Sequence, residues 1–398
     1  MRIAMVSEHA SPLPAPDAVD VGPQSRHVAE LAAALCRHGH EVTVYTRRDA
    51  PHLPDLVRAD RGYQVVHVPA GPAERLESLP HLGDFTNVLV EHWNANAPDV
   101  VHAHFWTSGL ASVLASRRTG VPVVQSYHEL GIAASSGDGS TSKRTDVERL
   151  LAREAAHVVA NCSNEAFDLI RMGMNRSRIS VIPSGVDIDA FTPDGPRAGR
   201  TLPRRVVTFG HLLPRSGLDH IIAALPALDD AELVIAGRSD DASEAKRLRA
   251  LTVEFGVAER VVFAGEVARS AQPALLRSAD VVVCGPWCDR PDALALEAMA
   301  CGAPVVTTAV GGLVDAVVNG VTGRHVPPRD PGALTRTLHS LLASDTDRYE
   351  FGIAGRDRVC ARYSWDRIAS DTLRVYERAR MLARQAPGAR VADRPSSG

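Results

Sequence analysis

The chain has 398 residues, of which 45% are hydrophobic and 23% are charged, and this composition is typical of a globular protein. A single hydrophobic core stops growing at roughly 250 to 300 residues, so the length predicts two domains with a cleft between them. The formal net charge of −3 offers no basic surface to a polyanion, and we therefore expect no nucleic-acid partner.

The sequence pattern predicts neither a signal peptide nor a transmembrane helix. The apolar stretch Met1–Val6 is too short for the core of a signal peptide, and no run of about 18 apolar residues occurs that would span a membrane. The six cysteines have the spacing of neither a disulfide framework nor a metal site. We expect a cytoplasmic protein without a transmembrane segment.

Short β-branched segments alternate with helical patterns in the first half of the chain, as they do in parallel sheets built from βαβ units. The first unit comprises a strand at 1–6, a helix at 24–38 and a strand at 41–46. Further strands are predicted at 64–68, 100–103, 121–126, 158–160 and 180–182. Together these elements predict a doubly wound domain at about 1–190.

A second series of strands follows a linker in the loop 191–203, which is rich in Pro, Gly and Arg. We predict these strands at 205–209, 232–236, 260–264, 280–284, 304–307 and 323–326, within a second domain at about 191–365. The helical pattern at 366–384 is expected to return to the first domain, and the composition of 385–398 predicts a disordered tail. Doubly wound sheets bind ligands at the carboxyl ends of their strands, so we expect the site where the two sheets face each other.

The most informative segment places two carboxylates, Asp289 and Glu297, eight residues apart around the start of a short helix. The helix continues into Ala298-Met299-Ala300-Cys301-Gly302 and the strand Pro304-Val305-Val306. This arrangement resembles the C-terminal half of the retaining glycosyltransferases of the GT-B fold, family 4. Shorter matches extend the resemblance over nearly the whole chain, at 9–13, 39–42, 101–104, 185–187 and 310–312.

The resemblance implies an α/β protein of the GT-B architecture, in which two doubly wound, Rossmann-like domains face a central cleft. It also implies that a sugar moves, with retention of configuration, from a UDP- or GDP-sugar to a hydroxyl group of a small-molecule or glycan acceptor. Neither a cofactor nor a metal is expected besides the nucleotide sugar itself. A second copy of the chain or a partner enzyme stays open as a further partner.

The same resemblance assigns residues to the donor. Glu297 is expected to hold the ribose, because two carboxylate oxygens match two adjacent hydroxyl donors. Asp289 stands where the family contacts the hydroxyls of the donor sugar, and His128 follows a predicted strand and faces that sugar. Gly311 and Gly312 also belong to the donor side. The alternative for Glu297 is an ordinary solvated helix residue.

On the acceptor side the resemblance places Gly22, Gln24 and His104. The family has two glycines in this turn, but Pro23 replaces one of them and removes an N–H donor, so an ordinary helix cap is the alternative. His102 and His104 flank one alanine and are expected to point to opposite faces of their strand, with one of them bordering the cleft. No third ligand has a suitable spacing from these histidines, and we expect no metal.

The residues expected to bind the donor diphosphate depart from the family pattern. The family has an Arg and a Lys after the first strand of the second domain, whereas the segment that starts at Gly210 has His211 and Ser216 there, with Arg215 beside them. Losing one such contact typically lowers the rate by about 100- to 1,000-fold. We assign catalytic roles to Arg215, His128 and Asp289.

These substitutions leave two alternatives to a fully active transferase. One is a catalytically weak or inactive protein that binds a nucleotide or a partner enzyme. The other is a sugar-nucleotide epimerase on the same fold, which fits the matched motifs less well.

Overall fold

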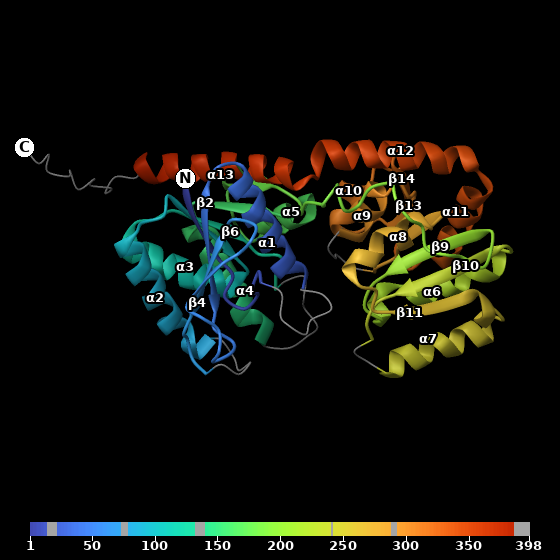
Figure 1. Cartoon of the computed structure of the whole chain (residues 1–398), viewed down its shortest axis with the longest axis horizontal. Helices are drawn as coiled ribbons and strands as arrows, with labels where there is room; N and C mark the ends of the chain where they lie inside the picture. The colour runs from blue at the N-terminus through green and yellow to red at the C-terminus, as the bar shows by residue number, and fades with distance from the viewer. Residues whose placement is uncertain (14–21, 73–78, 132–139, 240–241, 288–292, 386–398) are drawn as a thin grey trace, which may run out of the picture.

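The computed structural model describes residues 1–398 except 14–21, 73–78, 132–139, 240–241, 288–292 and 386–398. Two α/β lobes lie side by side, each built around one sheet (Figure 1). The first sheet has eight strands in the order β3-β4-β2-β1-β5-β6-β7-β8, and the second has six in the order β11-β10-β9-β12-β13-β14. The predicted fold class, two doubly wound Rossmann-like sheets, is confirmed.

The first sheet is parallel except at one edge. Its strands are β1 (Arg2–Val6), β2 (Glu41–Arg47), β3 (Leu56–Arg58), β4 (Gln64–Val68), β5 (Val100–His104), β6 (Val123–Ser126), β7 (His157–Ala160) and β8 (Ile179–Val181). Strand β3 pairs antiparallel with β4, and the sequence analysis missed it. Its three residues are partly or fully exposed, so they carry no apolar pattern.

Helices cover both faces of this sheet. They are α1 (Pro23–Arg37), α2 (Leu82–Ala95), α3 (Trp106–Thr119), α4 (Ser140–Glu154), α5 (Ser163–Arg171) and, from the end of the chain, α13 (Trp365–Gln385). One core forms between the sheet and helices α2 to α5, and the other forms between the sheet, α1 and α13. Because α13 contributes Trp365, Ile368 and Tyr376 to the second of these cores, it completes the first lobe. The predicted disordered tail at 385–398 lies, beyond Gln385, outside the described residues.

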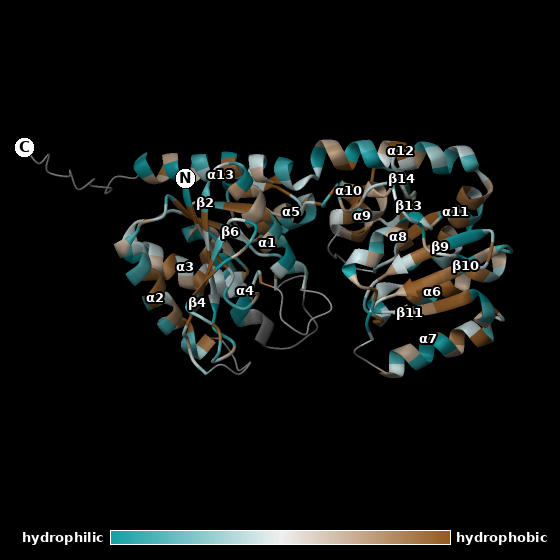
Figure 2. Cartoon of the chain, in the orientation of Figure 1, coloured by the Kyte–Doolittle hydropathy of each residue, from teal (hydrophilic) through white to brown (hydrophobic). Residues whose placement is uncertain are grey.

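The second lobe is also built around one sheet, and all of its strands are parallel. Its strands are β9 (Arg204–Phe209), β10 (Ala231–Ala236), β11 (Val261–Gly265), β12 (Val281–Cys284), β13 (Val305–Thr308) and β14 (Gly323–Val326). Its helices are α6 (Leu218–Ala224), α7 (Ala242–Glu254), α8 (Gln272–Arg277), α9 (Ala293–Ala300), α10 (Gly311–Ala316), α11 (Pro331–Ala343) and α12 (Asp345–Arg362). Hydrophobic residues run along β10 and the neighbouring strands, and hydrophilic ones lie on the outside of α12 and α13 (Figure 2).

The chain crosses between the lobes twice at one place. The amide of Val186, on the outgoing segment, donates to the carbonyl oxygen of Tyr363 on the returning segment at 2.7 Å. Gly185 has no room for a side chain, because a Cβ there would lie 2.5 Å from the Trp365 ring. A second link joins α5 to α10, where the amide of Ser163 donates to Asp315 Oδ2 at 2.6 Å. The two crossings therefore pack against each other.

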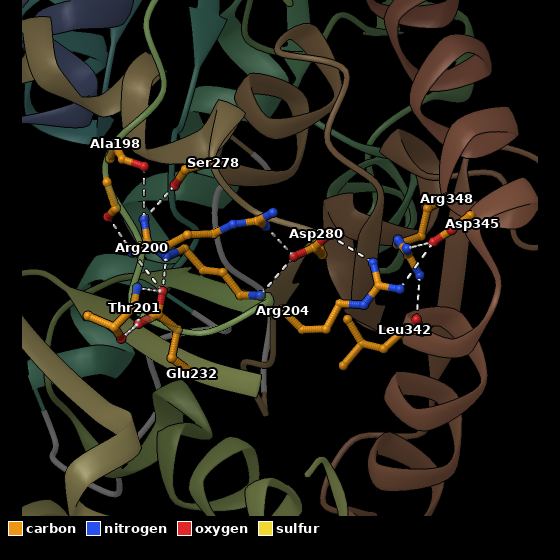
Figure 3. Close-up of polar contacts among 12 residues, drawn as sticks. Ala198, Arg200, Thr201, Arg204, Glu232, Ser278, Asp280, Leu342, Asp345 and Arg348 are labelled. Carbon is orange, nitrogen blue, oxygen red and sulfur yellow. Dashed lines mark hydrogen bonds and ion pairs between the residues drawn. The ribbon is translucent and has the colours of Figure 1, made fainter. Parts of the chain in front are cut away.

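A network of charged residues, two of them buried, lies at the amino-terminal edge of the second sheet (Figure 3). Arg205 Nε donates to Glu232 Oε1 at 2.7 Å, and these two residues are 4% and 1% exposed. Asp280 accepts from the amide of Arg205 at 2.8 Å and pairs with Arg200 and Arg204 at 3.0 and 3.6 Å. We refer to these five residues as the arginine network. It ties the start of β9 to the starts of β10 and β12.

None of the helices in the described part of the chain has an apolar stretch long enough to cross a membrane.

Candidate active site

Four histidines meet near the carboxyl edge of the first sheet. His102 and His104 come from β5, His128 follows β6, and His27 comes from α1. His104 Nδ1 lies 2.9 Å from His128 Nε2, and the ring of His27 lies 5.0 Å from that of His128. We call these four residues the histidine cluster. It brings together two residues predicted for the site, His104 and His128.

The prediction that His102 and His104 point to opposite faces of the strand is wrong, because their rings are 4.1 Å apart. Side chains alternate along a strand, so residues two apart share a face. His102 uses both ring nitrogens, at 2.7 Å from the Tyr376 hydroxyl and 2.9 Å from Ser126 Oγ. His104 is fully buried, and its Nε2 has no hydrogen-bond partner among the described residues.

Burial keeps the histidine cluster neutral. It lowers the pKa of His27 to about 4 and that of His102 to about 3, with a smaller contribution to His102 from His27. Burial, followed by the neighbouring histidines, also holds the pKa values of His104 and His128 well below the usual value. Such clusters of perturbed groups are frequent at functional sites.

The backbone at this edge adopts an uncommon conformation. The described residues other than glycine with positive φ are Phe105 (78°), His128 (62°) and Arg329 (59°), which follow β5, β6 and β14. Such conformations cost free energy and persist where the surrounding structure enforces them, often at functional sites. All three lie at the carboxyl edges of the two sheets, where doubly wound folds bind ligands.

The predicted acceptor-side residues lie beside the histidine cluster. Gln24 Nε2 is 3.5 Å from the carbonyl oxygen of His104 and 3.4 Å from Ser7 Oγ. Gly22 is the N-cap of α1 and Pro23 begins the helix, so the helix-cap alternative describes the local structure. Gln24 and His27 are three residues apart and therefore share a face of α1. That spacing was the signal by which His27, which the sequence analysis missed, could have been found.

In the second lobe, the predicted diphosphate loop follows the carboxyl end of β9. His211 and Arg215 are exposed, and Ser216 Oγ donates to the carbonyl oxygen of His211 at 2.8 Å. At the end of the loop Gly217 has a φ of 68°, and a Cβ there would lie 2.0 Å from the carbonyl oxygen of Gly285. The loop is therefore held tightly against the segment after β12 and presents two basic side chains to solvent.

Glu297, on α9, is 8% exposed, so the alternative of a solvated helix residue is wrong. Its Oε1 pairs with Arg269 Nη2 at 2.7 Å, and the Arg269 guanidinium also lies 4.2 Å above the centre of the Phe191 ring. The sequence analysis missed Arg269, because nothing in the local pattern links it to a helix formed 24 residues later.

The remaining predicted donor residues are placed differently. Gly311 and Gly312 begin α10, Gly311 with a φ of 46°, and Gly210 directly follows β9 with a φ of 157°. Asp289 lies outside the described residues. A groove of about 680 Å³ opens elsewhere, over β1, β2 and β4 beside α2, and none of the predicted site residues lines it.

The sequence and the fold both match known proteins. The profile of "Glycosyltransferase Family 4" matches residues 23–190, and that of "Glycosyl transferases group 1" matches residues 199–358. A protein of Xylanimonas cellulosilytica, named D-inositol 3-phosphate glycosyltransferase, is 36% identical over 95% of this chain and 97% of its own. The chain belongs to glycosyltransferase family 4. It is an enzyme that transfers a glycosyl group.

Further relatives agree with this assignment. A Jonesia denitrificans protein of the same name is 34% identical to the glycosyltransferase over 96% of this chain and 97% of its own. Among solved structures, the sucrose-phosphate synthase of Thermosynechococcus elongatus has a TM-score of 0.83 at 25% identity, covering 96% of this chain and 99% of its own. Anabaena Alr3699/HepE in complex with UDP has a TM-score of 0.75 at 20% identity, covering 95% and 100%. The GT-B fold is thus shared well beyond close sequence similarity.

Proposed function

We propose that the enzyme transfers a sugar, with retention of configuration, from a UDP- or GDP-sugar to a hydroxyl group of a small acceptor. The observation that carries the proposal is the position of the family-matched residues. His104 and His128 in the first lobe, and the loop from Gly210 in the second, lie at the carboxyl ends of their strands. Doubly wound sheets bind nucleotides at that edge.

In this proposal the second lobe holds the donor. Glu297 accepts hydrogen bonds from the ribose diol, while its contact with Arg269 orients the carboxylate. Arg215 and His211, both exposed at the end of β9, stabilise the negative charge that grows on the leaving diphosphate. Asp289 contacts the sugar hydroxyls. The transfer chemistry needs no resident metal in this scheme.

The first lobe contributes neutral groups. Burial holds the pKa of His128 well below its usual value, so the ring is neutral and orients the donor sugar through a hydrogen bond. Gln24 and His104 line the acceptor side. The guanidinium of Arg144 lies 4.9 Å above the ring of Phe105, the residue after His104, and its charge is paired with Glu148 at 2.7 Å.

We further propose that the acceptor is a phosphorylated cyclitol. Two relatives that match nearly the whole chain at 36% and 34% identity are named D-inositol 3-phosphate glycosyltransferase. Arg144, whose Nε donates to Glu148 Oε1 at 2.7 Å, is the candidate for contact with the phosphate group.

The test is a two-step assay on the full chain. Uridine, guanosine and thymidine diphosphates are first titrated by calorimetry, and the donor sugars of the preferred base are then incubated with inositol 3-phosphate. Mass spectrometry detects the product, and NMR reads the configuration of the new glycosidic bond. Transfer with retention supports the proposal. Inversion overturns the retaining mechanism, and diphosphate binding without any turnover supports the non-catalytic alternative.

A further inference from the structure

Three rings of the histidine cluster lie close enough together to hold a metal ion, although they are far apart in the sequence. One ring nitrogen from each of His27, His104 and His128 lies within 4.8 Å of the other two. The three side chains come from α1, from the end of β5 and from the segment after β6. His102 does not join them, because Tyr376 and Ser126 occupy both of its nitrogens.

The distances suit a small divalent ion. In a tetrahedral site with metal–nitrogen bonds of about 2.0–2.1 Å, two ligand nitrogens lie roughly 3.3 Å apart. His104 Nδ1 and His128 Nε2 already lie 2.9 Å apart and share one proton, which an ion would replace. From a separation of at most 4.8 Å, the third ring has to approach by only about 1.5 Å.

The surroundings of His27 and His128 also suit metal ligands. His27 Nδ1 lies 2.9 Å from Ser184 Oγ, a contact of the kind that orients metal-bound imidazoles from the second shell. His128 is only half-buried, which leaves a path from solvent.

We propose that His27, His104 and His128 form a binding site for a divalent ion of the zinc class. Neutral imidazoles prefer such ions to magnesium or calcium, which favour oxygen ligands. Three protein ligands leave the fourth position to water. Because His104 and His128 then point at the ion instead of the substrates, its binding inhibits sugar transfer, and this last step rests on the proposed function.

Metal binding is tested without any activity assay. The full chain is stripped with a chelator, dialysed and titrated with zinc chloride by calorimetry, and cobalt(II) is added separately to record the visible spectrum. We expect one saturable zinc site and the intense visible bands of tetrahedral cobalt without thiolate charge transfer. Absence of a saturable site overturns the proposal. Thiolate bands also overturn it, because they assign the ion to cysteines such as Cys36 or Cys360, which are free and only partly buried.

Variants identify the ligands. His104→Gln and, separately, His27→Gln are expected to weaken zinc binding by at least about tenfold. His157→Gln is the matched control, since His157 is equally buried in the same sheet and its Nε2 bonds Ser180 Oγ at 2.9 Å. Circular dichroism checks that each variant is folded. Equal zinc affinity in the wild type and both folded ligand variants overturns the assignment.

Inhibition forms a separate arm. Once transfer has been established, zinc should abolish it in the wild type, and a chelator should restore it. Zinc binding without any transfer activity refutes the proposed function and leaves the metal site standing. Full activity with zinc bound refutes the inhibitory step alone.

Discussion

The arginine network and the histidine cluster both contain buried titratable groups. The arginine network pairs opposite charges, whereas the histidine cluster keeps its groups neutral. In the arginine network at the amino-terminal edge of the second sheet, each buried charge faces an opposite one (Figure 3). In the histidine cluster at the carboxyl edge of the first sheet, the groups stay neutral, and one nitrogen of His104 has no partner in the part of the chain that the structure describes. Paired charges fix one structure, whereas unsatisfied neutral groups remain available to a ligand.

The electrostatics of Glu232 illustrate the first solution. Burial alone would raise the pKa of its carboxyl, but hydrogen bonds from Thr201 and Arg205 outweigh this effect and lower it. No comparable opposite charge contributes to the pKa values of His104 or His128, where the neighbouring histidines only add to the effect of burial. Mutations in the arginine network are therefore expected to change the stability of the fold, and mutations in the histidine cluster are expected to change ligand binding.

The largest effect is expected from a substitution that breaks the arginine network. Glu232→Ala leaves the buried Arg205 guanidinium without its partner and should lower the free energy of unfolding by about 3–5 kcal/mol. Denaturant unfolding of the second lobe measures the loss. The double variant Arg205→Met, Glu232→Leu should lose less than the single variant, because no unpaired charge remains. A single variant as stable as the wild type would contradict a structural role for the pair.

His157, a buried histidine outside the histidine cluster, shows how keeping a buried group neutral affects the free energy of unfolding. Burial, followed by Arg378 and Arg178, lowers the pKa of His157 from 6.5 to about 4. The unfolded chain therefore binds a proton that the folded chain refuses between these values, and stability falls as the pH drops through this window. The full effect is roughly 3 kcal/mol.

His157→Gln removes this titration. The stability of the variant should depend less steeply on pH than that of the wild type between pH 6.5 and 4, as measured by urea unfolding at several pH values. Parallel stability curves for the two proteins would show that His157 keeps its ordinary proton affinity in the folded state.

A smaller effect is expected at the donor site. There the buried carboxylate of Glu297 pairs with Arg269 and is proposed to bind the ribose. Glu297→Ala should weaken the affinity for the nucleotide diphosphate by about 1.5–3 kcal/mol, the scale of a hydrogen bond to a charged group. Calorimetry on a folded variant measures it. Arg269→Met is the matched control, since it removes the same ion pair and leaves the carboxylate in place. Equal losses in both variants would show that the ion pair, rather than ribose binding, matters.

The smallest expected effect restores charge in the diphosphate loop. The double change His211→Arg, Ser216→Lys adds two permanent cations at exposed or partly exposed positions after β9. Transfer or donor hydrolysis should rise at least about tenfold, because both cations act on the leaving diphosphate. A double variant that binds the diphosphate more tightly but turns over no faster would place these residues in ground-state binding.

Much of the architecture could be predicted from local patterns. Apolar runs such as 232–236 and 304–307 predict buried parallel strands, and β10 and β13 form there. The segment from Asp289 to Val306, taken together with the shorter matches along the chain, also indicates the family, because its helix and the following strand are encoded by neighbouring residues. Such features depend on the periodicity of side chains along one element. The three-residue edge strand β3 escaped for the same reason, since it has no periodicity to detect.

The partners of the site residues are decided by the tertiary structure. Sequence determined that His104 and His128 end neighbouring strands, but only the packing of α1 brings His27 to them, from 77 residues earlier in the chain than His104. Likewise, the sequence predicts a binding role for the carboxylate of Glu297, whereas its ion pair with Arg269 depends on how the short helices of the second lobe pack. Backbone periodicity is a local property of the chain. The distance between side chains on different elements depends on long-range packing, which burial of the cores establishes.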